Sequence, residues 1–123
     1  MKVFKTKWFA KWADKDNITD ESLFKAIIEM NNGLIDANLG GNVYKKRIAK
    51  KDKGKSGSTR TILAFKIDDK AFYIYGFAKN KKDNVDIKEL EALKLLAAEF
   101  LNYTDKKLFK ALEKGELMEI KND

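Results

Sequence analysis

Residues 59–78, TRTILAFKIDDKAFYIYGFA, decide the fold. Both halves of this stretch are rich in β-branched and aromatic residues, which favour strands, and the polar residues Asp68-Asp69-Lys70 separate them. A connection this short joins neighbouring antiparallel strands. The sequence therefore predicts a hairpin with strands at Thr59–Ile67 and Ala71–Ala78.

A third strand is predicted on the N-terminal side of this hairpin. Val43–Ala49 has a two-residue period, and residues 50–58 link it to the hairpin. The simplest arrangement of three such strands is an antiparallel meander. In a meander, the end of the first strand, the start of the second and the end of the third lie at one edge of the sheet. We therefore expect Arg47, Arg60 and Lys79 to converge at that edge.

Two helices are predicted before the meander. After a short strand at Val3–Lys5, the residues Trp8, Phe9 and Trp12 have the one-turn spacing of an amphipathic helix, and they are assigned no chemistry. The next helix has Thr19 as its N-cap and acidic residues at its positive end. Its expected buried stripe consists of Leu23, Phe24, Ile27 and Ile28.

Two more helices and a small strand are predicted after the meander. Asp86 and Glu89 form an Asp-x-x-Glu variant of the capping box, and apolar residues follow them at helical spacing. Thr104 begins a shorter helix that ends at Gly115. Leu117–Ile120 is a possible final strand.

The size of the chain favours one domain over residues 1–123. Its 123 residues, 44% of them hydrophobic and 37% charged, provide one compact core. The element order predicts an α+β fold in which N-terminal helices and a C-terminal helix pack on a mainly antiparallel sheet with a three-strand meander. We expect the helices to cover one face of that sheet.

The residues that the chain lacks exclude several classes of enzyme. The sequence contains no Cys and no His, which removes thiolate nucleophiles, imidazole triads and zinc sites built from these residues. No cofactor and no metal are expected. No apolar run approaches the roughly 20 residues that span a bilayer, and the first residues lack the apolar stretch of a signal peptide. We therefore expect a cytoplasmic protein.

The net charge of +7 is concentrated in one segment. Residues 43–60 contain eight basic residues and one acidic residue, whereas the rest of the chain is neutral. A block of one sign that also contains glycine and serine is typical of a loop that binds a polyanion, most often nucleic acid. A lysine-rich loop that only improves solubility is the alternative interpretation.

Aromatic residues dominate the third strand of the meander. In a regular strand, Tyr73, Tyr75, Phe77 and Lys79 share one face. If that face is open, the rings form a stacking surface for bases that leads to the cations. If a helix covers it, the rings belong to the core, and the sequence leaves both interpretations open.

Three stretches of sequence carry a family resemblance. They are GGNVYKKRIA at 40–49, GKSGSTRT at 54–61, and YGFAKN at 75–80 followed by Asp83-Asn84. This combination resembles the RelE/ParE superfamily of bacterial toxins, and within it the RelE/HigB-like branch. The resemblance implies a small RelE-like fold and an endoribonuclease that cleaves messenger RNA in the ribosomal A site and so inhibits translation.

The resemblance also implies roles for individual residues. Arg60 matches the principal phosphate-stabilising arginine, Arg47 and Lys79 match supporting cations, and Lys53 and Lys55 match loop cations. The candidate catalytic residues are Lys55, Arg60 and Lys79, and the candidate RNA-binding residues are Arg47, Lys50, Lys51, Lys53, Tyr73, Tyr75 and Asn80.

Metal-independent RNA cleavage needs a base for the 2′-hydroxyl, an acid for the 5′-oxygen and positive charge on the phosphorane. A lysine among other cations has a pKa below its usual value of about 10.4, so Lys55 and Lys79 are both candidates for proton transfer. RelE has a C-terminal tyrosine that contributes, whereas 20 residues follow Tyr103 here. This departure points to Lys79, Asn80 or a strand tyrosine.

Two other functions stay open. ParE-like toxins of the same superfamily inhibit DNA gyrase, and a noncatalytic nucleic-acid-binding domain would use the same lysines only to neutralise phosphates. The basic loop and the strand cations favour RNA cleavage. The expected partners are messenger RNA, the ribosome and a cognate antitoxin, a helix-turn-helix protein encoded next to the toxin, whose acidic segment covers the basic stretch. No membrane partner is expected.

Overall fold

The computed structural model describes residues 1–48, 59–78 and 85–121. Within these residues it contains four helices and six strands. The helices are α1 (Lys7–Lys15), α2 (Asp20–Asn31), α3 (Ile87–Leu101) and α4 (Asp105–Glu113). The strands are β1 (Lys2–Thr6), β2 (Ala37–Gly40), β3 (Val43–Ile48), β4 (Thr59–Lys66), β5 (Lys70–Ala78) and β6 (Leu117–Ile120).

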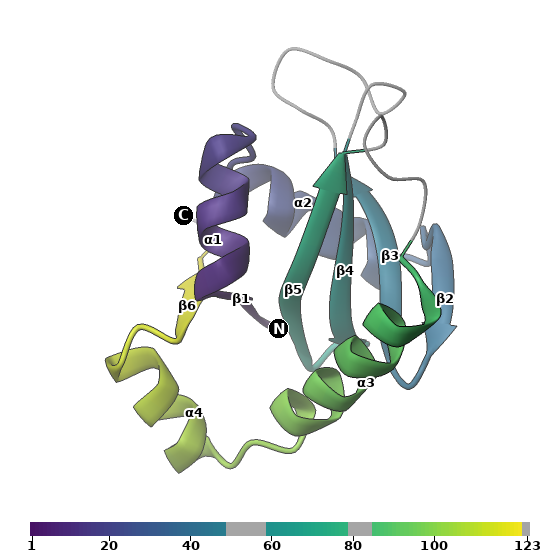
Figure 1. Ribbon diagram of the computed structural model, residues 1–123. Coiled ribbons are helices and arrows are strands. Elements are labelled where there is room, and N and C mark those ends of the chain that lie inside the picture. Colours follow the sequence, from purple (N-terminus) through teal and green to yellow (C-terminus); the bar gives the residue numbers. More distant parts are fainter. Residues whose placement is uncertain (49–58, 79–84, 122–123) are drawn as a thin grey trace.

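The six strands form one sheet in the order β2-β3-β4-β5-β1-β6 (Figure 1). The predicted meander of β3, β4 and β5 is confirmed, with antiparallel pairing throughout. β1 pairs in parallel with β5 on one side and antiparallel with β6 on the other. The α+β class and the mainly antiparallel sheet predicted from the sequence are therefore confirmed.

One strand, β2, was not predicted from the sequence. Its four residues, ANLG, include a glycine and an asparagine, which are depleted in strands. β2 forms because Gly40, Gly41 and Asn42 all have positive φ angles, of 89°, 62° and 62°, and reverse the chain into β3. This hairpin extends the meander to four strands.

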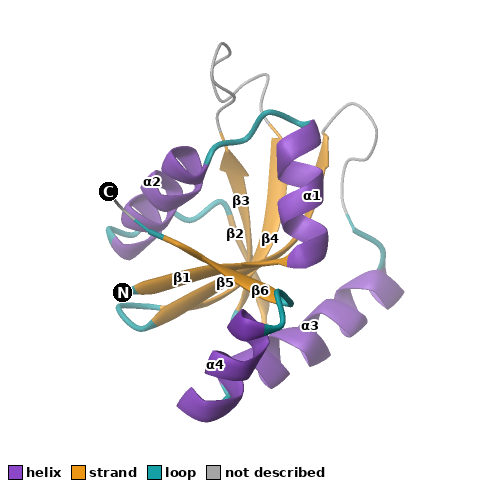
Figure 2. Ribbon diagram, turned by 90° about the vertical axis from the view of Figure 1, so that its left-hand side faces the viewer, coloured by secondary structure: helices purple, strands orange, loops and turns teal. Residues whose placement is uncertain are grey.

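The helices cover both faces of the sheet, so the expectation of helices on one face is wrong. α1 and α2 lie on one side of the sheet, and α3 and α4 lie on the other (Figure 2). Side chains of β4 alternate between the two layers: Leu63 and Phe65 belong to the α1/α2 core, whereas Ile62 and Ala64 belong to the α3/α4 core. Both cores are apolar, which is why the four consecutive residues Ile62–Phe65 of β4 and most of β5 are apolar.

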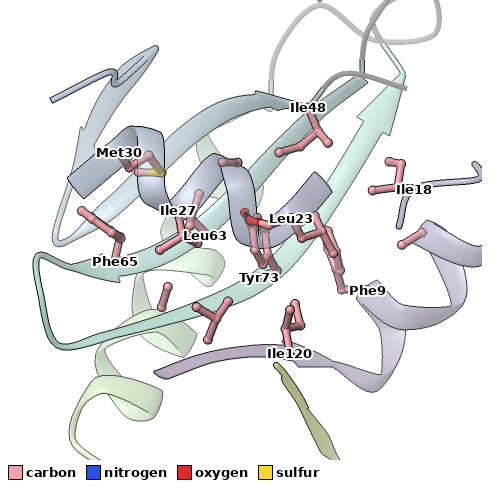
Figure 3. Packing of buried hydrophobic residues seen from close by; sticks show 14 residues of the cluster. Phe9, Ile18, Leu23, Ile27, Met30, Ile48, Leu63, Phe65, Tyr73 and Ile120 are labelled. Atoms are coloured by element: carbon pink, nitrogen blue, oxygen red, sulfur yellow. Dashed lines mark hydrogen bonds between the residues drawn. The ribbon is translucent and has the colours of Figure 1, made fainter. Parts of the chain in front are cut away.

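The α1/α2 core is built around Tyr73 (Figure 3). The Tyr73 ring stacks on Phe9 with 5.1 Å between centroids, and its hydroxyl donates a 2.7 Å hydrogen bond to the Leu23 carbonyl oxygen. Burial, and secondarily the charge of Glu29, raises the pKa of Tyr73, so the hydroxyl stays protonated. The predicted buried stripe of α2 is wrong at Ile28, which is 47% exposed.

The predicted helix starts are confirmed by their caps. The hydroxyl oxygen of Thr19 accepts a hydrogen bond from the Ser22 N–H, and Thr104 caps α4 in the same way. At the start of α3, the Asp86 carboxylate accepts from the Glu89 N–H at 2.8 Å, while the Glu89 side chain accepts from the Asp86 N–H. Such caps satisfy backbone donors that have no partner inside the helix.

The backbone of β5 at Gly76 lies directly against the Trp12 ring of α1. A Cβ atom added at Gly76 would lie 2.2 Å from Cζ3 of Trp12, far inside van der Waals contact. Only glycine therefore allows α1 to pack this closely on β5.

We predict that Gly76→Ala lowers the free energy of unfolding by about 1–3 kcal/mol, because the added methyl group overpacks the α1–β5 contact. Urea unfolding measures this change. In a Trp12→Leu background the same substitution should cost clearly less, since the clashing ring is gone. Equal costs in both backgrounds would contradict the close contact.

Candidate nucleic-acid interface

The candidate site lies at the edge of the sheet where β3 ends, β4 begins and β5 ends (Figure 1). Ile48 is the cross-strand partner of Thr59, and Thr59 is the partner of Ala78, so three neighbouring positions form one row. Six predicted site residues lie outside the described residues. These are Lys50, Lys51, Lys53, Lys55, Lys79 and Asn80.

Arg47 and Arg60 come together one residue inside this edge. They are directly opposed partners in the β3–β4 ladder, and Arg60 is also the partner of Phe77 in β5. The expected convergence is therefore confirmed for these two arginines. Because like charges at directly opposed positions repel, the pair is favourable for binding an anion and requires compensation when none is bound.

Asp36 provides that compensation on one side. Its carboxylate accepts a 2.7 Å hydrogen bond from the Arg47 backbone N–H and a 3.3 Å hydrogen bond from Arg47 Nε. The carboxylate therefore ends the β2–β3 ladder and fixes the direction of the guanidinium. Within the described residues, the terminal nitrogens of Arg47 form no further bond, and 43% of its side chain is exposed.

A buried lysine, Lys46, lies next to the contact between Asp36 and Arg47, which is called the Asp36–Arg47 clamp below. Lys46, with only 3% of its side chain exposed, places Nζ 3.1 Å from the Glu29 carboxylate, 3.2 Å from the Leu34 carbonyl oxygen and 4.0 Å from the Asp36 carboxylate. An ammonium group this deeply buried needs such partners, because its desolvation costs several kcal/mol. Lys46 thus connects α2 and the segment before β2 to the strand that carries Arg47.

The aromatic residues of β5 do not share one face, so this expectation is wrong. Ile62 pairs with Tyr75 and Leu63 pairs with Tyr73, which leaves Ile74 as an extra residue, a β-bulge. The bulge shifts the alternation of the strand, so Tyr73 enters the α1/α2 core and Tyr75 the α3/α4 side. Tyr73 has no exposed surface, and its predicted stacking on RNA is incompatible with this position.

Tyr75 lies close to the arginine pair. Its ring is 6.2 Å from the Phe77 ring, and Phe77 is the strand partner of Arg60. The Tyr75 hydroxyl donates a 3.2 Å hydrogen bond to Glu89, the capping-box residue of α3. Trp8 stacks on Tyr75 with 5.0 Å between ring centroids and remains 50% exposed. Trp8 and Tyr75 therefore form a partly exposed aromatic pair, whereas Phe77, which connects Tyr75 to Arg60, is buried.

The chemistry of this edge is cationic and aromatic. Two arginines at adjacent strand positions can hold a phosphate by charge-assisted hydrogen bonds, and exposed rings can stack on bases. Among residues 1–48, 59–78 and 85–121, no group of three or more carboxylates is placed to hold a metal ion. None of the helices in these ranges is long and apolar enough to cross a bilayer.

The geometry defines the class of protein. It is a basic α+β domain that carries a pair of arginines at one edge of its sheet. The family model described as the RelE toxin of the RelE / RelB toxin-antitoxin system matches residues 1–120, and the chain belongs to this family. It is therefore a toxin of the toxin-antitoxin type, with a cognate antitoxin as partner. No match was found among curated proteins.

Two residues of the site were not found from the sequence. Asp36 lies in an irregular segment before the unpredicted strand β2, and no motif marks it. Glu89 was identified as a helix cap, but its second role, holding Tyr75, depends on where α3 packs on the sheet. The capping-box motif marks Glu89 in the sequence. The role of Asp36 becomes visible only when the hairpin of β2 and β3 is known.

We predict that Asp36→Asn lowers the free energy of unfolding by about 1–3 kcal/mol, because the buried lysine and Arg47 both lose a charged partner. Denaturant titration measures the loss, and NMR of the Arg47 Nε–H group should show faster exchange with solvent. Asp20→Asn is the matched control. Its carboxylate bonds Lys5 Nζ at 2.7 Å, but it is 48% exposed, so a loss below about 1 kcal/mol is expected.

An Arg47 Nε–H signal that is unchanged in Asp36→Asn would contradict the clamp, whatever happens to stability.

Proposed function

We propose that this toxin is a metal-independent, ribosome-dependent endoribonuclease that cleaves messenger RNA and so inhibits translation. The observation that carries the proposal is the opposed pair Arg47 and Arg60 at the sheet edge. Residues 49–58 contain four lysines. They are flanked by Ile48 and Thr59, which are cross-strand partners next to the arginine pair. Family membership supports the same activity.

The proposed reaction is an internal transesterification. The 2′-oxygen of the RNA attacks the adjacent phosphorus, the bond from phosphorus to the 5′-oxygen breaks, and a 2′,3′-cyclic phosphate and a 5′-hydroxyl result. One group takes the 2′-hydroxyl proton and another gives a proton to the leaving oxygen. Arg60 stabilises the negative charge of the phosphorane, and Lys55 and Lys79 are the proposed proton-transfer residues.

The position of Arg60 favours a role in the transition state. β4 is paired with β3 on one side and β5 on the other, so the backbone of Arg60 is held on both sides. Pairing on both sides fixes the position from which the guanidinium group extends, which reduces the reorganisation needed when the phosphorane forms. Arg47, held by Asp36, is proposed to bind the same or a neighbouring phosphate.

The proposed setting follows from the substrate. A substrate of ribosome-bound messenger RNA supports a cytoplasmic location, and the proposed antitoxin is a helix-turn-helix protein encoded beside the toxin. Lys50, Lys51, Lys53, Tyr75 and Asn80 are proposed to contact RNA without taking part in the chemistry, by phosphate neutralisation or by stacking.

We predict that Arg60→Ala and Lys55→Ala reduce the rate of cleavage of ribosome-bound messenger RNA by about a hundredfold or more, with a smaller effect on RNA affinity. The reason is that both groups act on the transition state. Lys51→Ala is the control, and it should mainly weaken RNA binding and lower the salt slope by about one. Primer extension on ribosome-bound transcripts and growth arrest after induction provide the measurements.

Full cleavage and toxicity in Arg60→Ala and Lys55→Ala would show that these residues are not catalytic. Growth arrest by the wild type with intact messenger RNA and inhibited gyrase would show instead a ParE-like activity. RNA binding without cleavage or arrest would show a noncatalytic nucleic-acid-binding domain.

A further inference from the structure

A pocket of 340 Å³, here called the α4 pocket, lies along the solvent side of α4. Its volume is within the range of small-ligand sites, about 300–1,000 Å³. Four exposed lysines make it basic: Lys106, Lys107, Lys110 and Lys114. The sequence analysis assigned no function to these residues.

The helical period of α4 brings the lysines together. Lys106, Lys110 and Lys114 follow one another at intervals of four residues, which places them on one stripe of a helix. Leu108 and Ala111 are buried in the α3/α4 core and anchor the other side of α4. The lysine stripe therefore faces solvent.

The fold leaves the cations of the α4 pocket without neutralising partners. Outside residues 43–60 the basic and acidic residues of the chain balance, so composition alone does not reveal this cluster. Lys5, by contrast, pairs with Asp20 at 2.7 Å. Glu116 also lines the α4 pocket, but among the described residues no carboxylate forms an ion pair with its four lysines. Like charges around one hollow repel one another, and a bound anion relieves that repulsion.

Neutral hydrogen-bond donors lie at the N-terminal end of the α4 pocket. The Thr104 hydroxyl oxygen accepts a 3.1 Å hydrogen bond from the Lys107 N–H, which leaves the hydroxyl proton for a ligand. Lys107 Nζ lies 4.8 Å from the centroid of the Tyr103 ring, a contact that orients this lysine. Burial, followed by the charges of Glu99 and Glu116, raises the pKa of Tyr103. The phenol therefore stays protonated at neutral pH and can donate to an anion.

The length of the lysine stripe indicates the kind of anion. Lys106 and Lys114 are eight residues apart, which corresponds to about 12 Å along a helix. A single phosphate cannot contact both ends of a stripe of this length, whereas a chain of linked phosphates can. The ammonium group of lysine is a compact point charge that suits phosphate oxygens.

We propose that the α4 pocket binds an anion made of several linked phosphate groups, through its four lysines and the hydroxyl groups of Tyr103 and Thr104. Two sources share this chemistry, the sugar-phosphate backbone of RNA and a free polyphosphate. In both, successive phosphates would meet the lysines of the stripe in turn. The proposal goes beyond the proposed nuclease activity, because the α4 pocket takes no part in the cleavage reaction.

The position of the α4 pocket separates it from the arginine pair. In Figure 1 and Figure 2, α4 lies at the opposite end of the molecule from the sheet edge where β3 ends and β4 begins. A phosphate chain bound at α4 therefore leaves the arginine pair open. Binding at the two places would add affinity for a long polyanion, because each contact raises the local concentration of the other.

The experiment is an NMR titration of the full-length toxin with inorganic tripolyphosphate. Amide signals of residues 103–114 should shift, and they provide a dissociation constant for the α4 pocket alone. Lys106→Gln/Lys110→Gln should raise this dissociation constant about tenfold or more and should lower its salt slope by about two, because two charge contacts are lost. Both positions are exposed, so circular dichroism can verify that the variant folds.

Two controls separate a phosphate site from general attraction by charge. Lys11→Gln/Lys25→Gln removes the same charge from exposed positions of α1 and α2 and should leave the dissociation constant within about twofold of the wild-type value. A hexaglutamate peptide should bind the α4 pocket more than about tenfold more weakly than tripolyphosphate, because its carboxylates are at the ends of flexible side chains.

A second titration identifies the source of the phosphates. It uses a 2′-O-methyl RNA oligonucleotide, which has no 2′-hydroxyl and cannot be cleaved. Shifts of residues 103–114 that are lost in Lys106→Gln/Lys110→Gln would assign the α4 pocket to the RNA backbone. A response of these residues to tripolyphosphate alone would assign it to a free polyphosphate.

Three results would overturn the proposal. Residues 103–114 could respond to neither ligand. The control variant Lys11→Gln/Lys25→Gln could lose as much affinity as the α4 variant. Hexaglutamate could bind as tightly as tripolyphosphate, which would show a surface that selects only negative charge. A wild type that fails to cleave RNA would contradict the proposed function but would leave these binding results intact.

Discussion

The β-bulge at Ile74 is the constraint on which the arrangement of this protein depends. One extra residue in β5 directs Tyr73 into one core and Tyr75 into the other, and the strand remains paired with β4 on both sides of the bulge. Tyr73 then anchors α2 through its hydroxyl. Beyond the bulge, the register brings Phe77 opposite Arg60, and Gly76 turns its bare backbone to Trp12. The register of β5 against β4 therefore determines both how the two helical layers pack and where Arg60 lies.

The arginine pair is built on strands and is held by charges. Two cations at opposed positions repel each other, and the Asp36 carboxylate offsets this repulsion at Arg47. The buried ammonium group of Lys46 is itself neutralised by Glu29, with Asp36 4.0 Å away. Removing one partner from such a buried group costs more than the group contributes when it is complete. The network therefore holds Arg47 in one orientation, which suits the role in phosphate binding proposed for it.

Much of the fold could be predicted from the sequence, because strand period, turn residues and helix caps are local signals. The meander, the caps at Thr19, Asp86 and Thr104, and the convergence of Arg47 with Arg60 are all confirmed. The covered second face was missed because an apolar stripe on a helix does not tell which side of a sheet it meets. The position of Tyr73 was missed because a bulge breaks the alternation on which face assignments depend. Asp36 was missed because its role exists only after β2 has paired with β3.

The pairing of β1 with β6 has a consequence for how the molecule comes into being. Thr6 and Leu117 are cross-strand partners, although 111 positions of chain separate them. During synthesis, β1 cannot complete its hydrogen bonds until β6, which is made more than 100 residues later, has emerged from the ribosome. A nascent chain that stops short of residue 117 keeps an exposed edge on β1, a site at which strands of other molecules can add. Pairing β1 with β6 is thus a long-range step that must wait until both strands have been synthesised.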